Sequence, residues 1–579
     1  MPNAVGASVH HGPGRSSTVS AFLRHILVLA ATLTATAQTP APLLQSDESH
    51  TVRGTVINEV TGAPIARALV YTPGNRFAML TDGEGHFEFD LPKRESATGP
   101  ESQRYTFGPT VVMARKPGYL DDPNFRNQVE ATPGTEITLP LLPEGLIKGR
   151  VIFSEADPAP GATVQLYSRR VEEGMPRWVQ AGAIRANSNG EFRFAELQPG
   201  SYQVGTDELP DNDPATRVRG GKEYGYPPVY YPGVSDFAAA GTIQLTAGET
   251  VQADIPLTRQ PYYPVKIPVA NNDPLNNNLE VTVSVQGHRG PGYSLGFNPE
   301  NQVIEGSLPR GEYLVEAASR RGNASSGSVH LSVAGAPAQG PTLTLTPNSS
   351  IPVHVVEEFT SNDWAGSVVF GTTGRPVPLH GPRLYLQVVA EPVDAFTRGG
   401  FGLRPPSGPN DDTLVIENLE PGRYWLNLHS GRGYVASATM GGVDLLHEPF
   451  TVSPGTSTPI EITMRDDAAE IDGTVAGIGA TPDNSPHAGG FTLSAYVYCV
   501  PAPDSPGQYL ELTASSDGKV DYRMVAPGTY RVLAFKNPQQ NLPYRDPEAM
   551  KAFDSKGQLI HFSAGQKTTV QLQVISTNE

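Results

Sequence analysis

One short element occurs four times along the chain at a nearly constant spacing. It consists of an apolar residue, a turn that contains glycine, one further residue and a tyrosine; the four tyrosines are Tyr202, Tyr313, Tyr424 and Tyr530. Successive tyrosines lie 111, 111 and 106 residues apart, which is the length of one small domain. A repeat of this size predicts a tandem array of similar domains rather than one large core.

The composition of the element and of the whole chain indicates β-structure. A Pro-Gly turn allows its glycine a positive φ, and the tyrosine then opens a strand with its ring facing the core. The residues that follow Tyr530 alternate in polarity, as in a half-buried antiparallel strand. The chain also has 60 Gly and 55 Pro in 579 residues, an excess that disfavours helices. We therefore predict an all-β chain of about seven short strands per unit, the pattern of a β-sandwich.

Two further pieces recur within the units. Asp-Gly or Asn-Gly turns followed by aromatic residues occur in 81–89, 187–194 and 516–522, and they predict tight hairpins. Short apolar segments near the start of three units carry Gly54, Gly149 and Gly473. A glycine inside a strand suggests that another backbone approaches closely.

These patterns divide the chain into seven segments. In the last segment Asp546 can cap a short helix near 546–553, with Pro547 in its first turn. The predicted segments are a signal peptide (1–37), a linker (38–49) and five β-sandwiches (50–143, 144–259, 260–348, 349–467 and 468–579).

The N-terminus predicts export. Arg15 and Arg24 precede the apolar run 26–31, and small residues at 35–37 form an A-x-A cleavage site. The alternative is an N-terminal membrane anchor. No other run of 18 apolar residues occurs, so we expect no transmembrane segment in the mature chain and a periplasmic or extracellular location. The single cysteine excludes an intramolecular disulfide, and a net charge of −17 disfavours nucleic acid as a partner.

Residues 50–119 resemble a carboxypeptidase regulatory-like domain. The residues that carry the resemblance are Gly54-Thr55-Val56, Gly62-x-Pro64-Ile65, Ala68-x-Val70 and Thr81-Asp82-x-x-Gly85-x-Phe87-x-Phe89. The other units look like more distant relatives, and the arrangement is similar to exported acidobacterial proteins built from tandem domains of this kind. The resemblance implies Ig-like or transthyretin-like antiparallel β-sandwiches in an extended string. It implies no chemistry, and the first unit departs from the repeat because it lacks the glycine-x-tyrosine element.

Three sequence patterns could in principle carry chemistry. His354 and Glu357 match the start of a zinc-peptidase motif with His487 as a distant third ligand, but in a strand the first two side chains point to opposite faces. Ser294 lies in a G-x-S-x-G match that a turn follows, whereas a nucleophile elbow needs a helix. The Asp-Gly loops lack the full ligand set of a calcium loop. We expect no enzyme, no cofactor and no metal site, and we expect Cys499 to be a buried apolar residue.

The strongest binding signal is aromatic. Tyr226, Tyr230 and Tyr231 lie close together among prolines and glycines, and Trp364 offers a fourth ring for a ligand platform. The alternative is that this loop packs against its own sandwich. We predict a non-enzymatic structural or binding protein, with carbohydrate binding as the main hypothesis. A protein–protein scaffold or adhesion module of the cell envelope is the alternative, and a cryptic hydrolase at His354 or Ser294 is the third.

Overall fold

The computed structural model describes most of the chain after residue 50. The described residues are 51–72, 77–90, 110–121, 128–131, 136–154, 157–211, 223–271, 278–285, 292–319, 324–360, 369–370, 377–378, 381–393, 399–408, 411–477, 495–503, 505–515, 517–539 and 541–575. The predicted signal peptide and linker therefore lie outside the described residues. His50–Glu579 groups into one compact unit. Within the described ranges, no helix is long and apolar enough to cross a bilayer.

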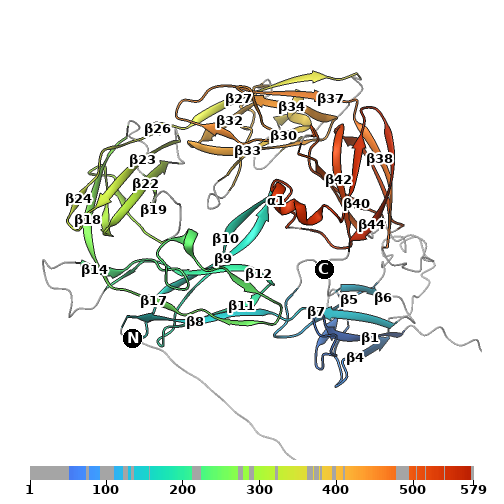
Figure 1. Cartoon of the computed structure of the whole chain (residues 1–579), viewed down its shortest axis with the longest axis horizontal. Coiled ribbons are helices and arrows are strands. Elements are labelled where there is room, and N and C mark those ends of the chain that lie inside the picture. Colours follow the sequence, from blue (N-terminus) through green and yellow to red (C-terminus); the bar gives the residue numbers. More distant parts are fainter. Residues whose placement is uncertain are drawn as a thin grey trace, which may run out of the picture. The chain divides into compact units, whose positions relative to one another are not determined.

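The described residues form five β-sandwiches in series, which confirms the prediction of an all-β tandem array. Sandwich 1 packs the sheet β4-β1-β7 against the sheet β3-β2-β5-β6, and Figure 1 shows β1, β4 and β7 in one layer. Its strands are β1 (Thr51–Asn58), β2 (Leu69–Tyr71), β3 (Ala78–Leu80), β4 (His86–Asp90), β5 (Thr110–Arg115), β6 (Gln128–Ala131) and β7 (Glu136–Leu141).

Sandwich 2 packs the sheet β10-β9-β12-β15 against β11-β8-β16, with β17 also paired to β8. A 3-10 helix, η3 (Phe237–Ala239), lies in the connection before β15. The strands are β8 (Gly145–Phe153), β9 (Thr163–Glu172), β10 (Met175–Arg185), β11 (Glu191–Leu197), β12 (Gly200–Thr206), β15 (Ile243–Leu245), β16 (Thr250–Gln252) and β17 (Ile255–Leu257).

Sandwich 3 takes two strands from within the sequence range predicted for its predecessor. The hairpin β13 (Leu209–Pro210) and β14 (Glu223–Tyr226) adds to the sheet of β18, which therefore reads β13-β14-β18-β21-β20 with β24 and β25 on β18; the facing sheet is β19-β22-β23-β26. The remaining strands are β18 (Gln260–Ala270), β19 (Glu280–Val285), β20 (Gly296–Asn298), β21 (Val303–Pro309), β22 (Gly311–Ser319), β23 (Ser325–Val333), β24 (Ala338–Gln339), β25 (Leu343–Thr344) and β26 (Thr346–Pro347).

Sandwich 4 packs β32-β27-β37-β34-β35 against β31-β30-β33-β36, with a separate hairpin β28-β29. A 3-10 helix, η4 (Gly381–Leu384), precedes β30. The strands are β27 (Ser349–Glu358), β28 (Val369–Phe370), β29 (Val377–Pro378), β30 (Leu386–Pro392), β31 (Phe401–Gly402), β32 (Val415–Leu419), β33 (Gly422–Ser430), β34 (Tyr434–Met440), β35 (Val443–Asp444), β36 (Phe450–Val452) and β37 (Ile460–Arg465).

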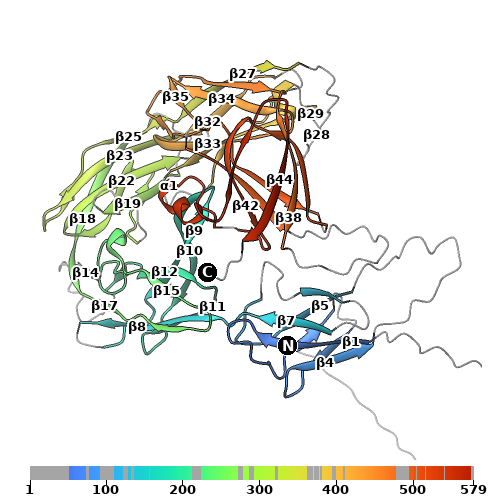
Figure 2. The same ribbon diagram turned by 45° about the vertical axis from the view of Figure 1, so that its right-hand side comes forward.

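Sandwich 5 is one continuous sheet, β40-β39-β42-β44-β38-β41, with β43 paired to β42; Figure 2 shows β38, β42 and β44 together. The helix α1 (Pro547–Met550) and the 3-10 turn η5 (Lys551–Phe553) follow β42, and the Asp546 carboxylate caps α1 by accepting from the N–H groups of Glu548 and Ala549. The strands are β38 (Ala469–Ala476), β39 (Ala495–Pro501), β40 (Leu510–Ala514), β41 (Lys519–Val525), β42 (Gly528–Phe535), β43 (Gln558–Phe562) and β44 (Lys567–Ile575).

The same strand pairing recurs in all five sandwiches. The first long strand pairs antiparallel with a strand from the middle of the unit and parallel with one or two strands near its end, as β1 does with β4 and β7. The equivalent sets are β8 with β11, β16 and β17; β18 with β21, β24 and β25; β27 with β32 and β37; and β38 with β41 and β44. Each unit is therefore closed by a parallel pair between its two ends.

Each sandwich has its own hydrophobic core. The five core clusters run from Val52 to Leu141, Ile147 to Leu257, Val265 to Leu345, Ile351 to Met464 and Ala469 to Leu572. A smaller cluster covers the second face of sandwich 5, where Met550 of α1 packs against Tyr498 and Phe535. The exact domain limits stay predictions.

The repeated tyrosine forms a corner between the two sheets in sandwiches 2, 3 and 4, and between two strands of the one sheet in sandwich 5. All four tyrosines are at most 5% exposed, as the inward-facing prediction requires. Each hydroxyl donates to the carbonyl oxygen four residues earlier: Tyr202 to Gln198 (2.7 Å), Tyr313 to Pro309 (2.9 Å), Tyr424 to Glu420 (2.8 Å) and Tyr530 to Ala526 (2.7 Å). This is the tyrosine corner of Ig-type sandwiches.

Two local predictions about these turns hold only in part or fail. Gly528 has a positive φ of 155°, as expected, but Gly200, Gly311 and Gly422 do not. In two units the left-handed residue is instead Glu196 or Asn418, with φ of 56° and 66°, at an irregularity in the strand pairing just before the corner. The Asp-Gly regions also do not form hairpins, because the strands on either side belong to opposite sheets or to opposite ends of one sheet. The turns form where the local sequence predicts them, but the packing of the whole sandwich determines which strand the chain pairs with next.

The three glycines near the start of the units lie against the closing strands, as predicted. A Cβ on Gly54 or Gly149 would overlap the carbonyl oxygen of Ile137 or Ala253, and one on Gly473 would lie 2.7 Å from Cγ2 of Val570. All three neighbours lie in or beside the strands that pair in parallel with the first strand. The glycine therefore allows the two ends of the unit to approach closely.

Candidate functional site

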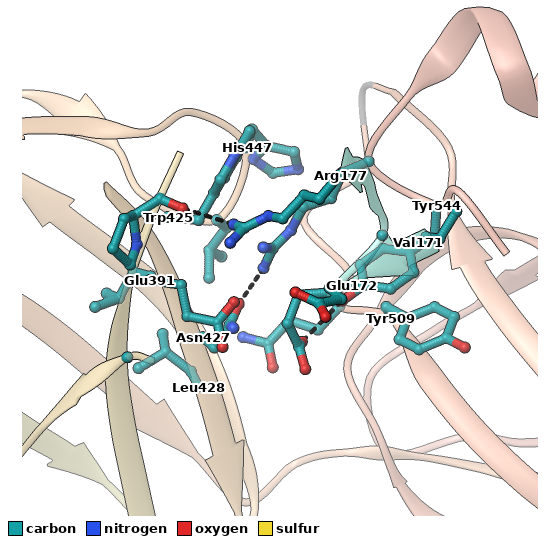
Figure 3. Close-up of a pocket in the computed structure, with 18 of the residues that line it drawn as sticks. Val171, Glu172, Arg177, Glu391, Trp425, Asn427, Leu428, His447, Tyr509 and Tyr544 are labelled. Carbon is teal, nitrogen blue, oxygen red and sulfur yellow. Dashed lines mark hydrogen bonds between the residues drawn. The ribbon is translucent and has the colours of Figure 1, made fainter. Parts of the chain in front are cut away.

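A cavity among the described residues lies between sandwiches 2, 3, 4 and 5. It has a volume of about 2300 Å³ and is lined by the β9–β10 hairpin, by β33, and by the segments of sandwich 5 around Tyr509 and Tyr544. Figure 3 shows that Arg177 of β10 lies there beside Trp425 and Asn427 of β33. Sandwich 2 thus contacts sandwiches 4 and 5, which are not its neighbours along the chain, a feature that a simple string of domains does not predict.

The tip of the β9–β10 hairpin forms the first part of this site. Glu173 and Gly174 both have positive φ, 47° and 76°, as a two-residue type I′ turn requires. Gly174 lies flat against the ring of Tyr544, and its carbonyl oxygen accepts from the N–H of Arg545 at 3.2 Å. Tyr544 in turn stacks on Tyr509 with ring centroids 3.8 Å apart and donates to Glu173 at 3.2 Å. We call this set of contacts, with those of the next paragraph, the hairpin lock.

Two arginines extend the hairpin lock to sandwich 4. Arg177 of β10 is only 7% exposed, and its Nη2 donates to the carbonyl oxygen of Pro392 at 2.6 Å. Arg545 donates from Nη2 to Oδ1 of Asn427 and lies over the ring of Trp425, with its Cζ 4.8 Å from the ring centroid. A guanidinium that is both hydrogen-bonded and stacked on an aromatic face is held in one orientation.

Burial dominates the electrostatics of the hairpin lock. It raises the pKa of Glu391, and the nearby charge of Glu173 adds to this while Arg177 and Arg545 oppose it. Burial also lowers the pKa of Arg545 and raises that of Tyr544 well above its ordinary value, so Tyr544 keeps its hydroxyl proton. Two arginines and two glutamates thus neutralise one another in a partly enclosed space, the arrangement that a buried charge cluster needs in order to be tolerated.

The predicted aromatic platform is distributed differently. Tyr230 is 3% exposed and forms a small cluster with Tyr167 and Phe237 on the outer face of sandwich 2, so it is not available for stacking on a ligand. Tyr226 stacks on Phe153 at 4.4 Å, and Tyr226 and Tyr231 both pack partly buried against the core of sandwich 2. Trp364 lies outside the described residues. Tyr230 and Tyr231 therefore stabilise sandwich 2, and Tyr226, on β14 of the sandwich 3 sheet, packs on sandwich 2 as well.

The residues named for hydrolysis do not converge. His354 is exposed on β27, and its Nδ1 lies 2.9 Å from Oε1 of Glu461 on the neighbouring β37, whereas Glu357 accepts from the hydroxyl of Tyr385. His487 lies outside the described residues. Ser294 is followed by β20 and a turn, without the helix of a nucleophile elbow.

The Asp-Gly loops and the cysteine also have structural roles. Oδ1 of Asp82 accepts from the N–H groups of Glu84 and His86, and Oδ1 of Asn187 does the same for Asn189 and Glu191. Across the described ranges, no three His, Cys, Asp or Glu side chains are grouped to hold a metal ion. Cys499 is fully buried, and burial raises the pKa of its thiol to about 12, which leaves it unreactive.

Most residues of the hairpin lock have no distinguishing pattern in the sequence. Trp425 carried one signal, because it directly follows the inward-facing Tyr424 and must point to the opposite face of β33. Glu173-Gly174 carried a weak turn signal. Nothing in the sequence connects that turn with Tyr544, which lies 370 residues later.

Comparisons with known proteins give a limited result. No protein-family model matches the chain, and no curated protein matches it. Among solved structures, the Bacillus anthracis TIE protein aligns with a TM-score of 0.15 and 11% identity over 88% of this chain and 65% of that one, slightly less than two thirds of its length. The minor pilin GBS52 of Streptococcus agalactiae aligns with a TM-score of 0.17 and 14% identity over 36% of this chain and 96% of that one. A streptococcal ancillary pilin aligns with a TM-score of 0.17 and 11% identity over 51% of this chain and 99% of that one. Scores of this size carry no argument about function.

Proposed function

We propose that this chain is an exported, non-enzymatic scaffold whose sandwiches 2, 4 and 5 are held as one body to present a surface to a protein partner of the cell envelope. The observation that supports this is the hairpin lock. A chain of independent binding modules needs no contacts between distant modules, because inter-domain motion is the default for domains joined by small polar interfaces. Here one hairpin tip has backbone, aromatic and arginine contacts with two distant sandwiches.

The chemistry of the hairpin lock supports a structural role. Three of its side chains bond to another side chain or to backbone: Arg177 to Pro392, Arg545 to Asn427 and Tyr544 to Glu173. A catalytic site would instead hold a nucleophile next to a base with space for a reacting atom. The charged side chains of the hairpin lock therefore join segments of different sandwiches.

A pair of glycine variants tests the scaffold proposal. Gly174→Ala places a Cβ 2.8 Å from the ring of Tyr544, whereas Gly161→Ala has the same backbone cost (φ of 75° against 76°) and meets no atom within 4 Å. Because Cys499 is buried, spin labels can be placed at Lys148→Cys in sandwich 2 and Gln571→Cys in sandwich 5. Distances between the labels are then measured by pulsed electron paramagnetic resonance.

The expected distance distribution is narrow in the parent protein and in Gly161→Ala, and broad in Gly174→Ala. A broad distribution in the parent protein would show that the sandwiches move independently and would overturn the proposal. An unchanged narrow distribution in Gly174→Ala would show that the hairpin lock is not what holds them.

Carbohydrate binding is the second candidate function. It is supported by Trp178 and Trp425, which line the cavity together with Asn427 and several carboxylates, a combination that suits sugar rings and hydroxyls. A glycan array with the parent protein and with Trp425→Ala tests this second candidate. Glycan binding that the substitution leaves unchanged would show that the glycan does not bind in this cavity. The signal peptide, the domain limits and the likeness of residues 50–119 to carboxypeptidase regulatory-like domains are further parts of the proposal.

A further inference from the structure

We infer that the cavity beside the hairpin lock binds an extended, cationic polypeptide segment. This goes beyond the scaffold function, since a scaffold needs only a fixed outer surface. Three observations carry the inference: the size of the cavity, the charge of its lining and a set of unpartnered N–H donors.

The size of the cavity favours a polymer. Its volume of about 2300 Å³ exceeds the roughly 300–1,000 Å³ of pockets that enclose small molecules. Its walls come from the strands and loops of four sandwiches rather than from one concave surface. A segment of a chain can follow such a space, whereas a small molecule would leave most of it filled with water.

The charge of the lining favours a cation. Eight Asp and Glu residues line the cavity against three arginines, Arg177, Arg531 and Arg545. Arg531 forms an ion pair with Asp554 at 2.8 Å, and the other two belong to the hairpin lock. Glu172 and Glu511 lie on the exposed part of the wall. Carboxylates that line one cleft add their fields and attract ligands of opposite charge.

Unpartnered donors give an independent indication of a ligand. Nε of Arg177, Nε1 of Trp425 and Nε2 of Gln508 are buried and have no hydrogen-bond partner in the structure, and all three residues line the cavity. Arg177 is more than nine-tenths buried. A buried N–H group without an acceptor costs about 1–3 kcal/mol, so a ligand that supplies acceptors would remove this cost.

A basic peptide satisfies both sets of groups at once. Its main-chain carbonyl oxygens can accept from the N–H groups of Arg177 and Trp425, and its lysine or arginine side chains can pair with Glu172 and Glu511. An acidic peptide supplies the acceptors but is repelled by the lining. A neutral oligosaccharide also supplies acceptors but makes no use of the charge, so the observations favour the cationic peptide.

Fluorescence anisotropy of the full chain tests this inference. The probe is a fluorescein-labelled twelve-residue peptide of alternating lysine and alanine, and the comparison probes are the same peptide with glutamate for lysine and unlabelled maltoheptaose as a competitor. We expect the lysine peptide to bind at low salt and its affinity to fall as salt is raised. Glu172→Gln with Glu511→Gln should weaken binding about five- to tenfold, and Trp425→Phe about threefold through loss of the indole N–H.

A matched double variant separates the cavity from the acidic surface as a whole. Glu84→Gln with Glu300→Gln removes the same charge from exposed positions that do not line the cavity, and it should change binding less than twofold. Equal weakening by both double variants, equal binding of the glutamate peptide, displacement by maltoheptaose or no binding of the lysine peptide would each overturn the inference. These outcomes leave the distances between spin labels unaffected, so failure here and failure of the scaffold proposal are distinguishable.

Discussion

The tyrosine corners and the hairpin lock stabilise this protein in opposite ways. Each corner is local: a hydroxyl bonds to a carbonyl four residues away, and the same arrangement occurs in four sandwiches. The hairpin lock occurs once in the part of the chain that the structure describes, and its contacts join Gly174 to Arg545 and Arg177 to Pro392. The difference shows that repeated local hydrogen bonds stabilise each sandwich, whereas contacts between residues far apart in the chain hold one sandwich against another.

The largest expected effect comes from removing a corner. Tyr530 is fully buried and packs against Phe562 at 5.6 Å, so Tyr530→Ala should lower the free energy of unfolding of sandwich 5 by about 3–5 kcal/mol. Urea denaturation followed by hydrogen exchange of β42 measures this. Tyr530→Phe keeps the ring and should cost only about 1 kcal/mol. If alanine and phenylalanine have equal effects, the packing of the ring is not what the corner contributes.

A smaller effect tests how the ends of a unit close. Gly149→Ala would force a Cβ against the backbone at Ala253, and we expect a loss of about 1–3 kcal/mol in the stability of sandwich 2. Gly182→Ala in the same sandwich is the control, because its nearest neighbour is a Phe194 ring carbon at 3.5 Å. Similar unfolding midpoints for the two variants would contradict the close approach of the parallel strands.

A single arginine tests the hairpin lock itself. Arg545→Lys removes the planar guanidinium that reaches Asn427 and covers Trp425, so the contacts of sandwich 5 with sandwich 4 should weaken by about 1 kcal/mol. We expect a red shift of tryptophan emission at a lower urea concentration than in the parent protein. Arg523→Lys, at an exposed position with its Nε 3.8 Å from Asp521, should leave the emission unchanged. A change of the same size there would show that the effect does not depend on the hairpin lock.

The smallest effect concerns a local turn and depends on pH. Backbone and side-chain hydrogen bonds from Ser407 hold the pKa of Asp411 well below its ordinary value. A carboxyl whose pKa is depressed by folding stabilises the protein above its unfolded pKa of about 4, and this contribution falls as the pH drops toward the folded value. Asp411→Asn should therefore destabilise sandwich 4 at pH 7 and have progressively less effect below pH 4. Asp412→Asn is the neighbouring control, and a difference from the parent that does not vary with pH would contradict the assignment.

The parts of the fold that could be predicted from the sequence are those set by neighbours in the chain. The inward tyrosines and the alternation after Tyr530 follow from side-chain periodicity, and the Asp-Gly turns from local hydrogen bonding. The prediction of hairpins at the Asp-Gly turns failed. The Asp82 turn is equally compatible with a hairpin and with a crossing to the opposite sheet, so its local sequence does not distinguish the two. It also missed that β14 joins the sheet of sandwich 3, because pairing of a short strand is decided by the edges available to it.

For the candidate site, the sequence indicated aromatic residues but not which of them meet. Tyr226, Tyr230 and Tyr231 stood out by their density, yet all three pack on sandwich 2. Tyr544, Arg545 and Arg177 did not stand out, because an arginine or tyrosine on a strand or loop has the same local pattern whether it faces solvent or another sandwich.

The sequence by itself determined an all-β chain of repeated units, because alternating polarity and turn residues act over a few positions and recur four times. Only the tertiary structure decided that each unit closes through a parallel pair of its ends and that a hairpin of sandwich 2 meets sandwiches 4 and 5. The physical reason is that these contacts join residues tens to hundreds of positions apart. Their stability depends on shape and burial at the meeting point, which no local pattern encodes.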